Sequence, residues 1–192
     1  MLTPPEQFGI IEKGVYRSDM LHPSQFSFIK ALQLKTALVL SPEVPTRAVT
    51  NFLEDNNIKL VHLGLRVWKF WKPNLGWRPV SEELIKDGLE MALDVENHPI
   101  LTWTYCNTRK RSGIHETGTF VGCLRKLQNW NFNSIVAEYR CYAGNKARYV
   151  NEQFIELFDM DLITLPHNLP SWFLEQQKLL QQEEEEEFTS TL

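Results

Sequence analysis

The 192 residues of this chain carry a formal net charge of −4, and the hydrophobic and charged fractions of 43% and 23% are typical of a soluble globular protein. This balance gives no reason to expect nucleic-acid binding. The three cysteines follow no repeating spacing, which argues against a disulfide framework, and no apolar run approaches the ~18 residues that a membrane-spanning helix needs. With no recognisable signal peptide, the sequence predicts a cytoplasmic protein without membrane or nucleic-acid partners.

The first half of the chain predicts alternating strands and helices. Lys35–Ser41 is a continuous apolar run, typical of a strand buried on both faces of a sheet. Ser81, followed by Glu82 and Glu83, provides an N-cap and acids for the first turn of a helix. Arg17 is interpreted as a surface charge on a hairpin. Strands are expected at 15–18, 35–41 and 58–65, and helices at 23–32, 46–55 and 81–95.

Ile100–Thr104 predicts a further short strand in the middle of the chain. A polar loop containing Gly113 follows, and a helix is expected from about Thr117. Phe120 and Leu124 belong to an apolar face of this helix with a spacing of 3.6 residues.

The rest of the chain predicts further helices and a tail. One helix is expected at 133–142, and Asn151 is expected to cap another. Cys123 and Cys141 lie on helices and are expected in the core. The sequence therefore divides into a folded domain at 1–163, a linker with a short amphipathic helix at 164–182, and a disordered acidic tail at 183–192.

Aromatic and basic residues alternate in the segment 66–79, and no acid lies between His62 and Ser81. Such a segment suits a surface that binds a partner, but it could also fill the domain's own core, and both interpretations stay open. His62 is interpreted as a packed residue, because no second ligand lies at metal-binding spacing, and neither a metal nor a cofactor is expected. The candidate docking residues are Trp68, Phe70, Trp71 and Trp77.

The strand, loop and helix start around residue 106 together make an anion site, because the loop amides and the helix dipole converge there. The same field favours a thiolate, and Cys106 is the candidate nucleophile, with Arg111 as its partner, if the protein is an enzyme. The candidate anion-binding residues are Arg109, Lys110, Arg111, Gly113, Thr117 and Gly118.

Two motifs link this chain to a known family. Val121–Trp130 reads Val-Gly-Cys-Leu-Arg-Lys-Leu-Gln-Asn-Trp, and the N-terminal part has Pro4-Pro5 and Phe8-Gly9 before Val15-Tyr-Arg-Ser18. Both motifs resemble the plant and fungal atypical dual-specificity phosphatases, a group of cysteine phosphatases, over roughly Pro4 to Asp161. A fungal, phosphatase-like member is therefore expected.

The chain departs from this family in the phosphate loop. Gly-Ile-His-Glu-Thr-Gly118 stands where the family has Gly-Lys-His-Arg-Thr-Gly, so Glu116 occupies the position of the arginine that grips the phosphoryl group. Counted from His98, the expected cysteine position is Thr104. Counted from Cys106, the loop ending at Arg111 is one residue short. Two unit charges 4 Å apart interact by about 4 kcal/mol at an effective dielectric of 20, so Glu116 would disfavour a phosphate dianion.

The resemblance implies an α/β sandwich with a mostly parallel sheet of four or five strands and helices on both faces. The loops after the strands at 58–65 and 100–104 would then meet at the carboxyl edge, where such sheets bind ligands. In cysteine phosphatases the loop that corresponds to 66–79 usually supplies an aspartate that protonates the leaving oxygen. The segment 66–79 contains no aspartate. The active relatives are similar to phosphatases of phosphotyrosine or inositol pyrophosphates.

Three hypotheses follow. The first is a pseudophosphatase that acts as an interaction subunit, with related phosphatase-like proteins as partners. The second is an active enzyme that uses Cys106, with Arg109 or Arg111 as the clamp. The third keeps only anion binding, in which Arg66 and the 109–111 cluster hold a phosphate or an inositol phosphate without cleaving it.

Overall fold

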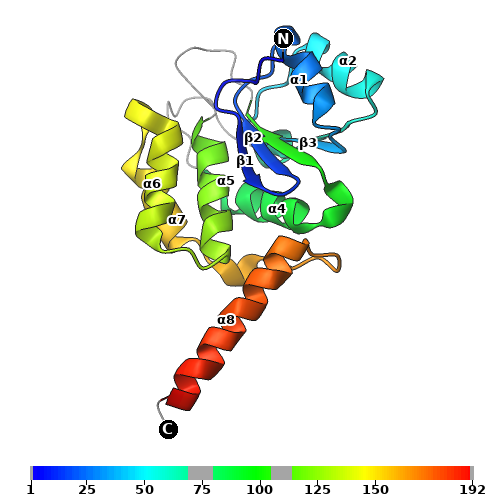
Figure 1. The fold of residues 1–192 in the computed structure, drawn as a ribbon. Helices are drawn as coiled ribbons and strands as arrows, with labels where there is room; N and C mark the ends of the chain where they lie inside the picture. The colour runs from blue at the N-terminus through cyan, green and yellow to red at the C-terminus, as the bar shows by residue number, and fades with distance from the viewer. Residues whose placement is uncertain (1, 69–79, 105–113, 191–192) are drawn as a thin grey trace.

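A five-stranded sheet crosses the centre of the computed structural model, which describes residues 2–68, 80–104 and 114–190 (Figure 1). The strand order is β1-β2-β5-β3-β4, and only the β1–β2 pair is antiparallel. The predicted α/β class with a mostly parallel sheet is confirmed, and β1 adds a strand that the sequence patterns did not indicate. The strands are β1 Gly9–Glu12, β2 Val15–Ser18, β3 Thr36–Val39, β4 Lys59–His62 and β5 Ile100–Trp103.

Helices cover both faces of the sheet (Figure 1). α1 and α2 lie on one face, and α4, α5 and α7 supply most of the apolar side chains on the other. The helices are α1 Phe26–Ala31, α2 Arg47–Asp55, α3 Leu63–Trp68, α4 Glu82–Leu93, α5 Ile114–Leu127, α6 Phe132–Ala143, α7 Tyr149–Leu157 and α8 Ser171–Ser190.

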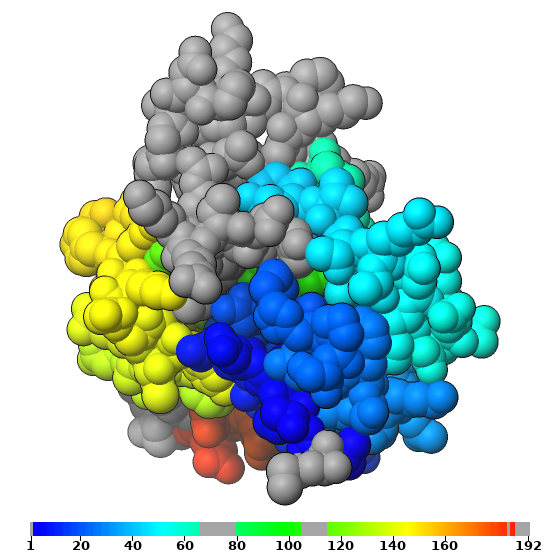
Figure 2. Space-filling view, turned by 90° about the horizontal axis from the view of Figure 1, so that it is seen from above, coloured from blue at the N-terminus to red at the C-terminus, as the bar shows by residue number. Residues whose placement is uncertain are grey.

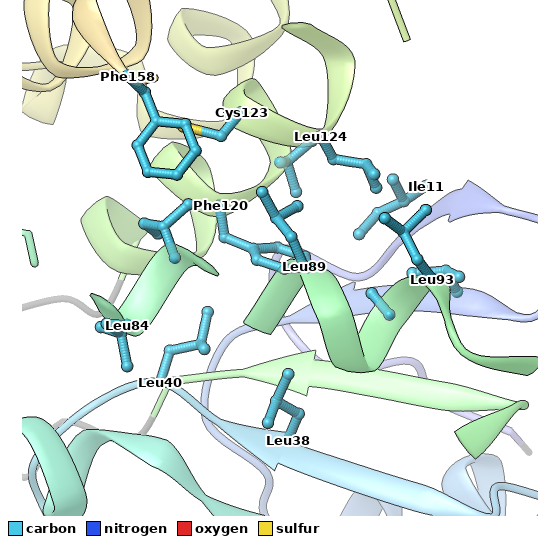
Figure 3. Packing of buried hydrophobic residues seen from close by; sticks show 14 of the residues in the cluster. Ile11, Leu38, Leu40, Leu84, Leu89, Leu93, Phe120, Cys123, Leu124 and Phe158 are labelled. Carbon is cyan, nitrogen blue, oxygen red and sulfur yellow. The ribbon is translucent and has the colours of Figure 1, made fainter. Parts of the chain in front are cut away.

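The two cores follow from the alternation of side chains along the buried strands. Successive residues of a strand point to opposite faces, and every residue of β3 and β5 is buried. Leu38 and Ile100 enter the larger core against α4 and α5, whose packed side chains are shown in Figure 3. Val39 and Trp103 enter the smaller core against α1 and α2. The central strands therefore hold the helical layers together.

Two glycines allow α5 to pack closely against its neighbouring helices. A Cβ at Gly122 would collide with the side chain of Ile155 on α7. A Cβ at Gly118 would lie 2.9 Å from the ring of Tyr139 on α6. Larger side chains at these positions would push α5 away from both helices.

The strand predicted at 58–65 is shorter than expected. β4 ends at His62, and α3 begins at Leu63. At Gly64, in the first turn of α3, the backbone passes so close to the carbonyl of Ser41 that a Cβ would collide with it, so only glycine fits there. His62 is half-buried, and its Nε2 lies 2.7 Å from the same carbonyl oxygen, consistent with a packed residue.

Two expectations for the C-terminal helices are wrong. Asn151 does not cap α7, because the helix already begins at Tyr149 and Arg148 is its N-cap. Asn151 is instead buried within the first turn, where a side-chain amide needs partners from other elements. Cys123 is buried as expected, but Cys141 is exposed on α6.

The C-terminal segment is also more helical than expected. α8 runs to Ser190 through the acidic run Glu183–Glu187, instead of ending near residue 182 before a disordered tail, and it extends away from the sheet (Figure 1). Phe173 anchors its first turn in the larger core. The division of the chain into domains stays a prediction. In the part of the chain that the structure describes, no helix is both long and apolar enough to cross a bilayer.

A buried arginine joins β1, α5 and α6. The side chain of Arg125 is only 6% exposed, and its Nη1 and Nε lie 2.7 Å and 2.9 Å from carboxylate oxygens of Glu12 and Glu138. Its Nη2 donates to the carbonyl of Ile11 at 3.0 Å, and the guanidinium lies 4.3 Å from the centre of the Trp130 ring. The positive charge of Arg125 is thus compensated by two carboxylates, a backbone carbonyl and an aromatic ring.

Replacing Arg125 with methionine should destabilise the fold by about 2 to 3 kcal/mol. The substitution leaves two carboxylates without their cation, and the figure lies below that of a fully buried pair because both carboxylates are 23% exposed. Urea unfolding measures the change. The matched control is Lys86→Met, which breaks the partly exposed Lys86–Glu90 pair on α4 and should change little. Equal midpoints for the two variants would contradict this role of Arg125.

Candidate functional site

The candidate site lies where β2 and β5 end at the same edge of the sheet. The two strands are parallel, and their register aligns Arg17 with Thr102 and Ser18 with Trp103. Thr104 follows directly after β5, and α5 begins at Ile114. In open α/β sheets, ligands bind at this carboxyl edge.

Arg17 is buried at this edge, which corrects the expectation of a surface charge. Its residue exposure is 2%, because its side chain points to the helix-covered face, towards α5 and α6, rather than to solvent. The guanidinium carbon lies 3.7 Å from the centre of the Tyr142 ring, a cation–π contact. Desolvation by burial lowers the pKa of Arg17 to about 10, so the side chain is still charged at neutral pH.

Arg17 lines a narrow polar hollow, which has no room for a water molecule, together with Thr104 directly after β5 and Thr117 of α5. The Oγ1 atoms of Thr104 and Thr117 lie 3.3 Å apart, within hydrogen-bonding distance of each other. Asp19 accepts a hydrogen bond from the amide of Met20 at 2.8 Å, and burial raises the pKa of its carboxyl group. On this face the N-terminal segment lies beside α6 (Figure 2). The lining residues are Gln7, Arg17, Ser18, Asp19, Thr104 and Thr117.

Most of the site residues predicted from the sequence lie outside the described residues: Cys106, Arg109, Lys110, Arg111, Gly113, Phe70, Trp71 and Trp77. Trp68 ends α3. Thr117 lines the hollow, whereas Gly118 faces Tyr139 and serves the packing of α5 on α6. Their roles in anion binding stay predictions.

Glu116 lies in the first turn of α5, one residue before Thr117. The positive end of a helix dipole stabilises an acid at this place. Glu116 also places a negative charge at the helix start, a position that would otherwise attract a phosphate. Among the described residues, no group of three or more His, Cys, Asp or Glu side chains could hold a metal ion.

His115 belongs to a buried polar cluster behind the first turn of α5. The Tyr139 hydroxyl accepts hydrogen bonds from Asn151 Nδ2 at 2.9 Å and from the amide of Arg148 at 3.2 Å. Its own proton is therefore directed to Nδ1 of His115, 3.3 Å away, which Asn151 Nδ2 also approaches at 3.1 Å. Burial, together with the charges of Arg148 and Lys146, lowers the pKa of His115 to about 4. The imidazole is thus neutral, and it locks α5 to α6 and α7.

Arg17 and the His115 cluster were missed as site residues for one reason. Nothing in a local pattern shows which distant element will cover a charge. The signal available for Arg17 was its place two residues inside a strand that begins with the fully buried Val15, which puts both side chains on one face.

Comparison with known proteins shows the same family over most of the chain. Residues 2–176 match the model of the tyrosine phosphatase family. The chain is 44% identical to a Dictyostelium discoideum protein named probable tyrosine-protein phosphatase DG1060, over 88% of this chain and 95% of that protein. It is 41% identical to the inositol diphosphatase DSP3 of Arabidopsis thaliana, over 83% of this chain and 73% of that protein.

Solved structures agree with this assignment. The core catalytic domain of the PP-IP phosphatase Siw14 from S. cerevisiae, in complex with citrate, is 37% identical and superposes with a TM-score of 0.72. The match covers 84% of this chain and 90% of that domain. The resemblance found in the sequence is therefore confirmed at the level of the family and the fold.

The His115 cluster makes stability depend on pH between about 4 and 6.5. The folded-state pKa lies below the ordinary value, so the unfolded chain takes up the proton first and stability is lost as the pH falls through this window. Urea midpoints measured from pH 7 to pH 4 should therefore fall less steeply in His115→Gln than in wild type. The difference in slope corresponds to the uptake of up to about one proton on unfolding. The exposed His167→Gln is the control and should keep the wild-type slope. Identical slopes in all three proteins would show that His115 titrates normally in the fold.

Proposed function

This chain belongs to the tyrosine phosphatase family, and we propose that within it the protein is a pseudophosphatase, an interaction or regulatory subunit without catalytic activity. Glu116 carries the proposal. It lies in the first turn of α5, where the family resemblance expects the arginine that grips the phosphoryl oxygens. An acid there repels the dianion that the arginine would hold, and it supplies none of the forked donors that phosphoryl transfer requires.

The end of β5 supports the same proposal. Thr104 stands where the resemblance places the cysteine nucleophile, and its hydroxyl lies against that of Thr117. A threonine hydroxyl needs an adjacent base to act as a nucleophile. Among the described residues that line the hollow, Asp19 is the only acid or base besides Arg17, and its carboxylate already accepts from the backbone of Met20.

Two alternatives keep part of the family's chemistry. In the first, Cys106 attacks phosphorus with Arg109 or Arg111 as the clamp, and the substrate is a phosphotyrosine or an inositol pyrophosphate; the names of DSP3 and Siw14 favour the latter. In the second, Arg66 and the cations at 109–111 hold a phosphate or inositol phosphate without cleaving it. The citrate in the Siw14 structure supports a small anion as the ligand.

The partner proposed for the subunit is a related phosphatase-like protein. The docking surface is the aromatic segment with Trp68, Phe70, Trp71 and Trp77, which alternate with cations. We place the complex in the cytoplasm and in a fungal cell, as the composition and the resemblance suggest.

The purified protein should release no phosphate above background from p-nitrophenyl phosphate, a phosphotyrosine peptide or an inositol pyrophosphate. The reason is the acid at position 116 in place of an arginine. A malachite-green assay run beside Cys106→Ser provides the measurement and its control. Turnover that disappears in Cys106→Ser would overturn the proposal in favour of the enzyme.

Trp68→Ala/Trp71→Ala should fold normally and lose the partner. The expectation is that indole rings at a docking surface contribute most of the binding energy, so two truncations weaken the complex at least tenfold. A related phosphatase-like subunit is the bait in a pull-down, after thermal melts have shown equal folding. Tyr149→Ala, which removes an exposed ring from α7, is the matched control. An early melt of the double variant would mean that the rings belong to the core, and full partner retention would refute docking.

A further inference from the structure

We propose that two copies of this chain pair through the solvent-facing side of α7, with the two α7 helices antiparallel about a two-fold axis at Gln153. This surface, the α7 face, consists of Tyr149, Val150, Gln153, Glu156 and Leu157. It contains none of the residues proposed above for docking or for anion binding. The inference therefore goes beyond the proposed function and does not rest on it.

α7 has two different long faces. Its inner face is buried, because Asn151 and Glu152 bond to side chains of α6 and Ile155 packs on α5. A helix that is apolar only towards its own core shows polar residues on the opposite side. The opposite side of α7 instead carries Tyr149 and Leu157, which are 71% and 78% exposed. Among the large hydrophobic residues that the structure describes, these two have the highest exposure.

The exposed side chains of the α7 face form one continuous stripe. Tyr149, Gln153 and Leu157 are spaced by four residues, so they lie one above the other, and the exposed Val150 lies beside them. At a rise of 1.5 Å per residue the stripe is about 12 Å long, the full length of the helix. Single exposed apolar residues are common on soluble proteins, whereas a contiguous apolar stripe marks an interaction surface.

The charges at the two ends of the α7 face identify a second copy of this chain as the partner. Lys146 and Arg148 lie just before the first turn of α7, whereas Glu156 lies in its last turn, and Asp159 and Asp161 follow it. All five side chains are exposed. An antiparallel copy brings the basic end of each helix beside the acidic end of the other, twice by symmetry. A parallel copy would bring like charges together.

The same charges are arranged unfavourably for α7 on its own. A helix dipole favours acids at the N-terminus and cations at the C-terminus, and the exposed charges flanking α7 have the reverse order. In an antiparallel pair each charged end lies beside the opposite dipole end of the other helix, which removes the conflict. Lys146, Arg148 and Glu156 form no ion pair with another described residue, so they are available to a second copy.

Gln153 sets the register of the pair. It lies midway between Tyr149 and Leu157, so a two-fold axis at Gln153 places each Tyr149 ring against Leu157 of the other copy. At the centre the two Gln153 amides can bond to each other, because each carries both donors and an acceptor. Glu156 then lies level with Val150 of the other copy, within half a turn of Arg148.

The contact is small, so the dimer is reversible. Two helices in contact along about 12 Å bury less than the roughly 1,200–2,000 Å² of a standard interface. The expected dissociation constant is on the order of 10 to 100 μM. The apolar centre supplies most of the affinity, and the charged ends select the antiparallel direction and weaken as salt is added.

Sedimentation velocity of the full chain at low salt, from about 1 to 500 μM, tests the proposal. The average mass of wild type should rise from the 22.5 kDa of one chain towards twice that value. Leu157→Ser should weaken the dimer at least tenfold. The matched control is Leu179→Ser, which removes an exposed leucine from the part of α8 that extends away from the sheet (Figure 1), and it should keep the wild-type curve. Thermal melts of both variants should match wild type, because both leucines are exposed.

A charge exchange tests the antiparallel arrangement directly. Glu156→Arg and Arg148→Glu each place like charges at both ends of the pair, so each variant alone should be monomeric over the same concentrations. An equimolar mixture of the two variants should restore a dimer, because every end again pairs an arginine with a glutamate. If Leu157→Ser melts well below wild type, this mixture decides, since Arg148 and Glu156 are exposed and in no ion pair with a described residue.

Three results would overturn the inference. Wild type that stays monomeric throughout would exclude the dimer, and a different protein bound in a Leu157-dependent way would then be the occupant of the α7 face. A dimer that Leu157→Ser leaves unchanged would use another surface. Two charge variants that stay monomeric when mixed would refute the antiparallel pairing. The pseudophosphatase proposal is unaffected by each of these results, because phosphate release from substrates tests it separately.

Discussion

The position of β5 between β2 and β3 is the constraint on which the rest of the structure depends. Both neighbours run parallel to β5, so three strands end at one edge and α5 returns along the face of the sheet. The same register places Arg17 beside Thr102, and hence near Thr104 and the first turn of α5. Side chains at these positions meet at this edge of the sheet whatever their identity. The fold thus sets where these residues meet, and their identity decides the chemistry there.

Two buried arginines, Arg17 on β2 and Arg125 on α5, illustrate that decision. Arg125 has carboxylate partners and joins β1 to α5 and α6. Arg17 has an aromatic ring on one face, and its buried Nε and Nη1 have no hydrogen-bond partner among the described residues. The first arrangement stabilises the fold, and the second leaves two buried donors of a charged group unpaired. Glu116, in the first turn of α5, has the opposite charge. It is an acid at the position where the family resemblance implies an arginine.

The sequence predicts the central elements well because their signals are local. The apolar run of β3 and the Ser81 N-cap of α4, whose Oγ accepts from the amide of Leu84, follow from short windows. The failures share a dependence on distant contacts. Arg17 is buried by α6, and Asn151 is buried against Tyr139 rather than capping a helix. The family was recognisable from Val121–Trp130, a motif whose first half lies on α5 and places Val121, Cys123 and Leu124 in the core.

We propose that the segment between β5 and α5 does not activate a cysteine for attack on phosphorus. The most direct test is the pH dependence of alkylation at Cys106, followed by mass spectrometry, with the exposed Cys141 as the internal reference thiol and the buried Cys123 as the unreactive one. The account predicts that Cys106 reacts over the same pH range as Cys141 and that phosphate gives no protection. Reaction of Cys106 that persists two pH units lower, and that phosphate blocks, would contradict it by showing a thiolate held in a working phosphate site.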